Sequence, residues 1–185
     1  FQTSIGEFVI DESSQATSGF GLVVGFSGYA RHSVDGDTRV ALNWGLFASR
    51  YETESFGYQG ADLALVYERA IRTGRWFISP YLRQIWRSEN ASDLYRGLRL
   101  GVGSRLTLRD QLDINLVHEQ RSYSGQSHLD GPFSSLSLGL NRQLSPSRSI
   151  ELGIGGDRST PQSEHLRYVG AKLSLGAQQD WQGGL

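Results

Sequence analysis

Apolar and polar residues alternate along most of this chain, from Gly19 to Ala177. Leu98, Leu100 and Val102, for example, are each separated by one polar or small residue. This period of two places apolar side chains on one face of a strand and polar ones on the other. The pattern predicts strands over residues 5–10, 20–31, 39–49, 60–71, 76–86, 94–106, 112–119, 133–144, 149–155 and 167–177.

The connections between these segments alternate in length. Tight turns are predicted at residues 34–37, 72–74, 108–111 and 145–147, and longer polar stretches at residues 50–59, 87–93, 120–132 and 156–166. Short turns at one edge and long loops at the other are typical of outer-membrane barrels, in which the short turns face the periplasm. The sequence therefore predicts an all-β, antiparallel up-and-down transmembrane β-barrel. A soluble β-sandwich is the alternative, but it has no reason to keep this asymmetry.

The predicted outward face is uncharged over the width of a membrane. It comprises Phe20, Leu22, Val24, Phe26, Val40, Leu42, Trp44, Leu46, Ala61, Leu63, Leu65, Tyr67, Trp76, Ile78, Pro80, Leu82, Trp86, Leu98, Leu100, Val102, Leu112, Ile114, Leu116, Leu136, Leu138, Leu140, Ile150, Leu152, Ile154, Val169, Ala171, Leu173 and Leu175. Tyr67 and Trp76 flank a tight turn. Trp86 ends, at the loop side, the predicted strand that Trp76 begins. We expect these three aromatic residues to lie at the two membrane interfaces.

The opposite face is polar and rich in glycine and arginine, with few aromatic residues among the positions assigned to it. The candidate lumen-lining charges are Glu68, Arg83, Arg99, Arg105, Asp113, Glu119, Arg121 and Glu151. Because both signs occur on neighbouring strands, we expect Glu68 to pair with Arg83, Asp113 with Arg83 or Arg99, and Arg121 with Glu119. A salt-bridged wall explains each of these charges better than a substrate contact does. The many small residues leave room for a pore or a plug.

Composition supports this interpretation. Hydrophobic residues make up 38% of the 185 positions, which is low for the two-layered core of a sandwich, whereas the 23 glycines suit a barrel interior. The formal net charge of -1 argues against nucleic acid as a partner. Of the 18 basic residues all but one are arginine, whose planar guanidinium suits lumen ion pairs and lipopolysaccharide headgroups.

Catalytic and metal-binding chemistry has little support. The chain has no cysteine, and none of its 4 histidines has a second ligand at a spacing typical of zinc, so we expect no metal and no cofactor. The combination of His118, Glu119 and Asp113 is the nearest approach to a general base, yet no matched nucleophile accompanies it. We therefore expect a protein without catalytic residues.

Several segments together resemble the barrel domain of the surface lipoprotein assembly modifier family, Slam. In chain order they are residues 34–39 and 47–51, residues 92–100, residues 119–123, residues 128–131 with 135–138, residues 166–170, and residues 179–185, which read Gln-Asp-Trp-Gln-Gly-Gly-Leu. Their order and spacing carry more weight than any one of them. The resemblance covers nearly the whole chain.

The resemblance implies a transmembrane barrel domain over residues 1–185 that represents about ten strands of a larger barrel. From the resemblance we expect the family's further strands and its helical-repeat periplasmic domain to lie outside these residues. It also implies a multi-pass protein of the bacterial outer membrane that moves lipoproteins to the cell surface without catalysis or a cofactor. The partners it implies are the bilayer and lipopolysaccharide, surface lipoprotein cargo, periplasmic chaperones and the barrel assembly machinery.

Two other functions are compatible with this sequence. A polysaccharide-export porin or another outer-membrane porin would share the architecture, although such a pore should carry lumen aromatics and carboxylates for sugar contact. An outer-membrane barrel hydrolase is less favoured and would depend on His118.

Overall fold

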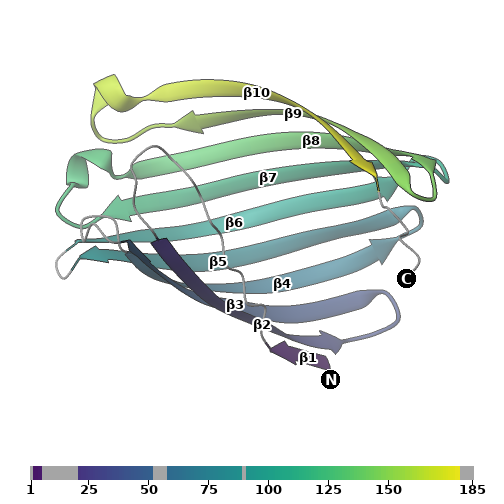
Figure 1. Cartoon of the computed structure of the whole chain (residues 1–185), viewed down its shortest axis with the longest axis horizontal. Coiled ribbons are helices and arrows are strands. Elements are labelled where there is room, and N and C mark those ends of the chain that lie inside the picture. Colours follow the sequence, from purple (N-terminus) through teal and green to yellow (C-terminus); the bar gives the residue numbers. More distant parts are fainter. Residues whose placement is uncertain (1, 6–20, 52–57, 89–90, 180–185) are drawn as a thin grey trace.

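The protein forms one antiparallel β-sheet in which each strand pairs with the strands before and after it in the sequence. The computed structural model describes residues 2–5, 21–51, 58–88, 91–179. Figure 1 shows the strands side by side in chain order in a single curved layer, from β1 at one edge to β10 at the other. The strands are β1 (Gln2–Ile5), β2 (Gly21–Ser33), β3 (Thr38–Tyr51), β4 (Tyr58–Ile71), β5 (Gly74–Ser88), β6 (Ala91–Arg105), β7 (Asp110–Tyr123), β8 (Gly131–Ser145), β9 (Arg148–Ser159) and β10 (Tyr168–Gln179).

The register confirms the predicted alternation of faces. Leu100 lies opposite Leu116, which lies opposite Leu136 on the next strand. In the neighbouring row, Gly101 lies opposite Asn115. Since residues directly opposite each other share a face, the apolar positions of successive strands form one continuous surface and the polar positions form the other.

Strand ends differ from the sequence prediction mainly at the loop side. The tight turns between β2 and β3, β4 and β5, β6 and β7, and β8 and β9 are all present. The predicted loop over residues 87–93 is wrong for most of its length, because β5 extends to Ser88 through a bulge and β6 begins at Ala91. The predicted first strand, residues 5–10, lies outside the described residues except for Ile5, and Phe20 also lies outside them.

The remaining long connections at the loop side contain two short 3-10 helices, η2 (Ser127–Leu129) and η3 (Glu164–Leu166). Figure 1 shows both at the edge of the sheet opposite the tight turn that joins β8 and β9. In the described part of the chain, no helix is long and apolar enough to cross a membrane.

Burial is reversed relative to that of a soluble domain. Among the residues whose exposure the structure describes, no hydrophobic side chain is buried, whereas Ser79, Asp93 and Glu119 are each less than a tenth exposed. Leu98 and Leu138 are 36% and 37% exposed, with no second layer of protein over them. A soluble sheet would have to cover this apolar surface, so the arrangement requires an apolar solvent on that side.

Candidate functional site

The polar face of the sheet is the candidate functional surface. Successive strands place all eight predicted lumen-lining charges on this face, as the register shows for Arg99 and Arg105 on β6 and for Asp113, Glu119 and Arg121 on β7. Glu68 on β4, Arg83 on β5 and Glu151 on β9 share it. The structure thus brings the predicted set onto one surface.

The ion pairs along this face differ in part from those expected. Arg121 binds Glu119 as predicted, with two guanidinium nitrogens each 2.7 Å from Glu119 Oε1. The predicted pairing of Glu68 with Arg83 is wrong, because Glu68 binds Arg39 at 3.7 Å and Arg75 at 3.3 Å. These two arginines follow tight turns and had no assigned role in the sequence pattern.

Asp113 is also partnered differently. Its carboxylate accepts hydrogen bonds from the side-chain amide of Gln111, at 2.9 and 3.2 Å. The expected partners lie elsewhere, since Arg83 is directly opposite Asp62 and the Arg99 guanidinium lies 4.2 Å from the ring centre of Tyr81. Sequence alternation gave the face of each charge but not its depth along the strand, which depends on register.

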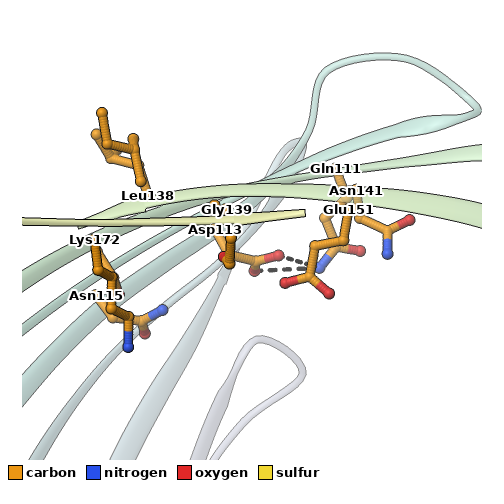
Figure 2. A pocket seen from close by; sticks show the side chains of 12 residues that line it. Gln111, Asp113, Asn115, Leu138, Gly139, Asn141, Glu151 and Lys172 are labelled. Atoms are coloured by element: carbon orange, nitrogen blue, oxygen red, sulfur yellow. Dashed lines mark hydrogen bonds between the residues drawn. The ribbon is translucent and has the colours of Figure 1, made fainter. Parts of the chain in front are cut away.

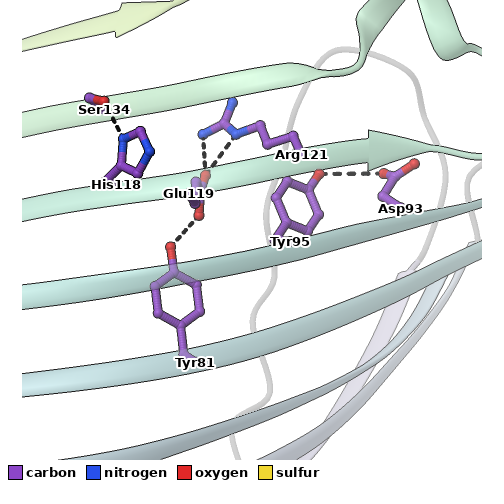
Figure 3. Close-up of polar contacts among 7 residues, drawn as sticks. All are labelled: Tyr81, Asp93, Tyr95, His118, Glu119, Arg121 and Ser134. Atoms are coloured by element: carbon purple, nitrogen blue, oxygen red, sulfur yellow. Dashed lines mark hydrogen bonds and ion pairs between the residues drawn. The ribbon is translucent and has the colours of Figure 1, made fainter.

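A polar network spans β5, β6 and β7 near the loop side of this face (Figure 3). The Tyr81 hydroxyl donates to Glu119, whose other oxygen binds Arg121. The Arg121 guanidinium lies 3.8 Å from the ring centre of Phe133. It also lies over the ring of Tyr95 on β6, 5.7 Å from the ring centre, so these contacts link β5, β6 and β7.

Aromatic residues are more common on the polar face than the sequence analysis expected. Register places Phe77 and Tyr81 there, together with Tyr29, Phe47, Tyr58, Tyr95, Tyr123, Phe133 and Tyr168. The expectation of few aromatics was wrong, and with it the argument against a sugar-conducting pore that rested on it. The alternation could have predicted these aromatic residues, because they occupy the strand positions whose side chains point to the polar face.

Several of these rings lie over glycines of the neighbouring strand. A Cβ atom at Gly97 would come within 2.7 Å of the Tyr81 ring, and one at Gly101 would collide with Phe77. The glycines therefore provide space for aromatic rings rather than for an open pore at these positions.

The three predicted interfacial aromatics lie on the apolar face. The rings of Tyr67 and Trp76 contact each other, with centroids 5.4 Å apart, beside the turn that joins β4 and β5. Trp86 is exposed near the other end of β5. Their positions at opposite ends of the strands match the expected spacing, while their depth in a membrane stays a prediction.

The predicted general-base cluster is not assembled. His118 and Glu119 are neighbours in β7 and therefore point to opposite faces, which separates His118 from Asp113 and Glu119. Instead, His118 Nδ1 lies 2.8 Å from the Ser134 hydroxyl on the apolar side (Figure 3). Among the described residues, no group of three His, Cys, Asp or Glu side chains could hold a metal ion.

The described strands form two cavities on the polar face that bear on function. One, of about 320 Å³, lies over β7 to β10 and includes Asp113, Glu151 and Lys172. Figure 2 shows these three side chains on one side of the sheet and Leu138 on the other. The second cavity, of about 330 Å³, lies over β2 to β6 and is rich in arginine.

Comparison with known proteins identifies the family of this chain. The family model described as surface lipoprotein assembly modifier matches residues 47–185. The chain belongs to this family. Its sequence matches no curated protein. The family match confirms the resemblance found in the sequence and covers β4 to β10 in full.

Solved structures agree on the fold. The in-vitro folded form of OmpT, an outer membrane protein of Vibrio cholerae, aligns with a TM-score of 0.63 and 10% sequence identity over 87% of this chain. OmpT of Vibrio cholerae expressed in the outer membrane gives a TM-score of 0.59 at the same identity and coverage. The chain covers 56% of each of these structures. This family member therefore has the fold of a bacterial outer-membrane β-barrel protein and is located in that membrane.

Proposed function

We propose that this chain forms part of an outer-membrane barrel that delivers lipoproteins to the bacterial cell surface. The match to the surface lipoprotein assembly modifier family over residues 47–185 carries the proposal. The structure supports it with an apolar face suited to lipid and a polar face suited to a hydrated polypeptide. The cargo is then a lipoprotein chain that crosses the membrane along the polar face.

The proposed mechanism needs no catalytic step. The polar face offers hydrogen-bonding groups and charges of both signs, which an extended polypeptide can contact in place of water. The edge strands β1 and β10 each pair with one described neighbour, and a strand edge in lipid must be paired. We propose that further strands complete the barrel, and that lipopolysaccharide, periplasmic chaperones and the barrel assembly machinery are its other partners.

Deletion of the complete gene tests this function directly. Surface lipoproteins of the deletion strain are measured on intact cells by antibody labelling and by protease digestion. We expect lipoproteins to be made and to remain inside the outer membrane, and the complete gene on a plasmid to restore display. Normal display in the deletion strain, with loss of polysaccharide export instead, would favour the porin.

The His118–Ser134 contact supports a second test, against a hydrolase. A serine and a histidine in hydrogen-bond contact, here 2.8 Å apart, are two of the groups that a nucleophilic site needs, and such a site also needs a group that orients the histidine. We propose that the pair is structural. His118→Ala should leave surface display at the wild-type level, and loss of lipid or peptide hydrolysis in this variant would refute the proposal.

A further inference from the structure

The arginine-rich cavity on the polar face has a lining suited to binding anions. Arg31 on β2, Arg39 on β3, Arg75 on β5 and Arg99 on β6 line it, together with Glu68 on β4. Within the described residues, Glu68 is the one carboxylate of this lining. Positive side chains therefore exceed negative ones by three, which makes the cavity attractive to anions.

The arginines are held in two ways that leave them available. Glu68 bridges Arg39 and Arg75, whose side chains remain 51% and 62% exposed. The Arg99 guanidinium stacks on the ring of Tyr81 at 4.2 Å, and that of Arg31 lies 5.5 Å from the ring centre of Tyr29. Stacking occupies the face of a guanidinium and leaves N–H groups along its edge that can bind a carboxylate.

The cavity over β7 to β10 has the opposite charge balance. Asp113 and Glu151 outnumber Lys172 among its charged lining residues (Figure 2). Both cavities open on the polar face, so a negatively charged segment is attracted to β2–β6 and repelled from β7–β10. The sheet thus presents two sides of different charge to any chain that passes along it.

Position identifies the class of anion. Arg39 follows the turn between β2 and β3, and Arg75 follows the turn between β4 and β5, so the cavity begins near the edge that faces the periplasm in outer-membrane barrels. It extends from there to Arg99 at the middle of β6. It opens on the face opposite the exposed leucines, away from lipid headgroups. A polypeptide that arrives from the periplasm can reach it, and its anionic groups are Asp and Glu side chains.

We propose that this arginine cavity binds an acidic segment of the transported polypeptide at the periplasmic side of the barrel. This inference rests on the proposed function, because it assigns a binding site for the cargo. Binding here holds an extended chain against β2–β6 before it moves further along the polar face.

The test uses the complete protein in lipid nanodiscs and a short fluorescent peptide rich in glutamate, with a glutamine-rich peptide of equal length as the reference. Fluorescence anisotropy measures binding. The variant Arg31→Gln/Arg99→Gln leaves the Glu68 ion pairs intact. The matched control, Arg72→Gln/Arg109→Gln, removes the same charge from exposed turn positions at the same edge.

We expect the wild type to prefer the glutamate peptide and the Arg31→Gln/Arg99→Gln variant to bind it about tenfold more weakly. The turn variant should bind like the wild type. The variant Arg31→Lys/Arg99→Lys keeps the charge and should retain part of the peptide binding. Retention would show that the loss of binding in the glutamine variant does not come from misfolding. Equal binding of both peptides, or full binding by Arg31→Gln/Arg99→Gln, would overturn the proposal.

Two further measurements separate the possible failures. The first measurement adds a soluble phospholipid headgroup analogue as the probe. If the analogue binds to the arginines and is displaced by millimolar inorganic phosphate but not by the glutamate peptide, the site serves lipid and the proposal is wrong. If the deletion strain still displays all its lipoproteins, the proposed function fails even when the peptide binds. If display is lost but the peptide does not bind, only the arginine site fails.

Discussion

At the scale of single residues, polar partners are the most informative feature of this protein. Glu119 is 8% exposed and accepts from both Tyr81 and Arg121. Such a carboxylate is stable only because its oxygens have partners, and its removal leaves Arg121 without its counter-ion. The network therefore matters for the stability of β5, β6 and β7 together.

Glu119→Ala should lower the free energy of unfolding by about 3 kcal/mol, because it breaks a largely buried ion pair. Urea unfolding of the complete protein in lipid vesicles, followed by tryptophan fluorescence, measures the loss. Glu164→Ala is the matched control, since Glu164 is 84% exposed in its pair with Arg167 and should change stability by less than about 0.5 kcal/mol. Equal effects of the two changes would contradict the structure.

Residue-level prediction from the sequence succeeded for faces and failed for partners. Alternation alone put Glu68 and Arg83 on the polar face, where the structure has them. It could not show that Glu68 lies between Arg39 and Arg75, because a pairing depends on how far each strand is shifted against its neighbour. Of the ion pairs that we predicted, the one between Arg121 and Glu119 is confirmed, because these residues are two apart on one strand and share a face whatever the register.

At the scale of strands, aromatic rings and glycines pack against each other across neighbours. Phe77 on β5 occupies the space that a side chain at Gly101 on β6 would need. This contact fixes the relative position of the two strands on the polar face, where no apolar core is available to do so.

Gly101→Ala should therefore destabilise the folded protein by about 1 to 3 kcal/mol through overpacking. Gly139→Ala is the control, because the nearest atom to a Cβ there is Glu151 Oε1, 4.0 Å away. Adding Phe77→Ala to Gly101→Ala should reduce the penalty of the glycine change, as a double-mutant cycle would show. Independent, additive effects of the two changes would rule out the contact.

The turn between β2 and β3 makes a pH-dependent contribution. The Asp35 carboxylate accepts backbone hydrogen bonds from Asp37 at 2.8 Å and Thr38 at 2.6 Å, which lower the pKa of Asp35. Since the folded pKa is below the unfolded one, the stabilisation is present above the unfolded pKa of 3.8 and is lost as the pH falls through the folded pKa.

Asp35→Ala should accordingly lower the urea midpoint at pH 7, and the difference from the wild type should shrink as the pH falls from the unfolded pKa of 3.8 through the lower pKa of the folded carboxyl. The midpoint is measured across the acid range for both proteins. The turn itself was predicted from its sequence, Val-Asp-Gly-Asp, whose aspartates favour such side-chain to backbone contacts. A difference that grows toward low pH would contradict this account.

At the scale of the whole molecule, the sequence predicted the sheet, its order and its two faces, because period-two alternation survives along nine of the described strands. Strand lengths were underestimated, as at β5 and β6, where polar residues such as Arg87 and Asp93 continue the strands and bind each other at 2.5 Å. The two cavities could not be predicted, since each is built from four or more strands.

The central claim is that one face of this sheet contacts acyl chains and the other contacts water. Residues 1–185 contain no cysteine, so single cysteines can be placed along β8 at residues 135–140. The complete protein, with any cysteine outside these residues replaced by serine, is then spin-labelled in vesicles. Collisions with oxygen report lipid, and collisions with a water-soluble nickel complex report water. We predict high oxygen access at Leu136, Leu138 and Leu140 and high nickel access at Ser135, Ser137 and Gly139. Equal nickel access at all six positions, or the reverse alternation, would contradict the account.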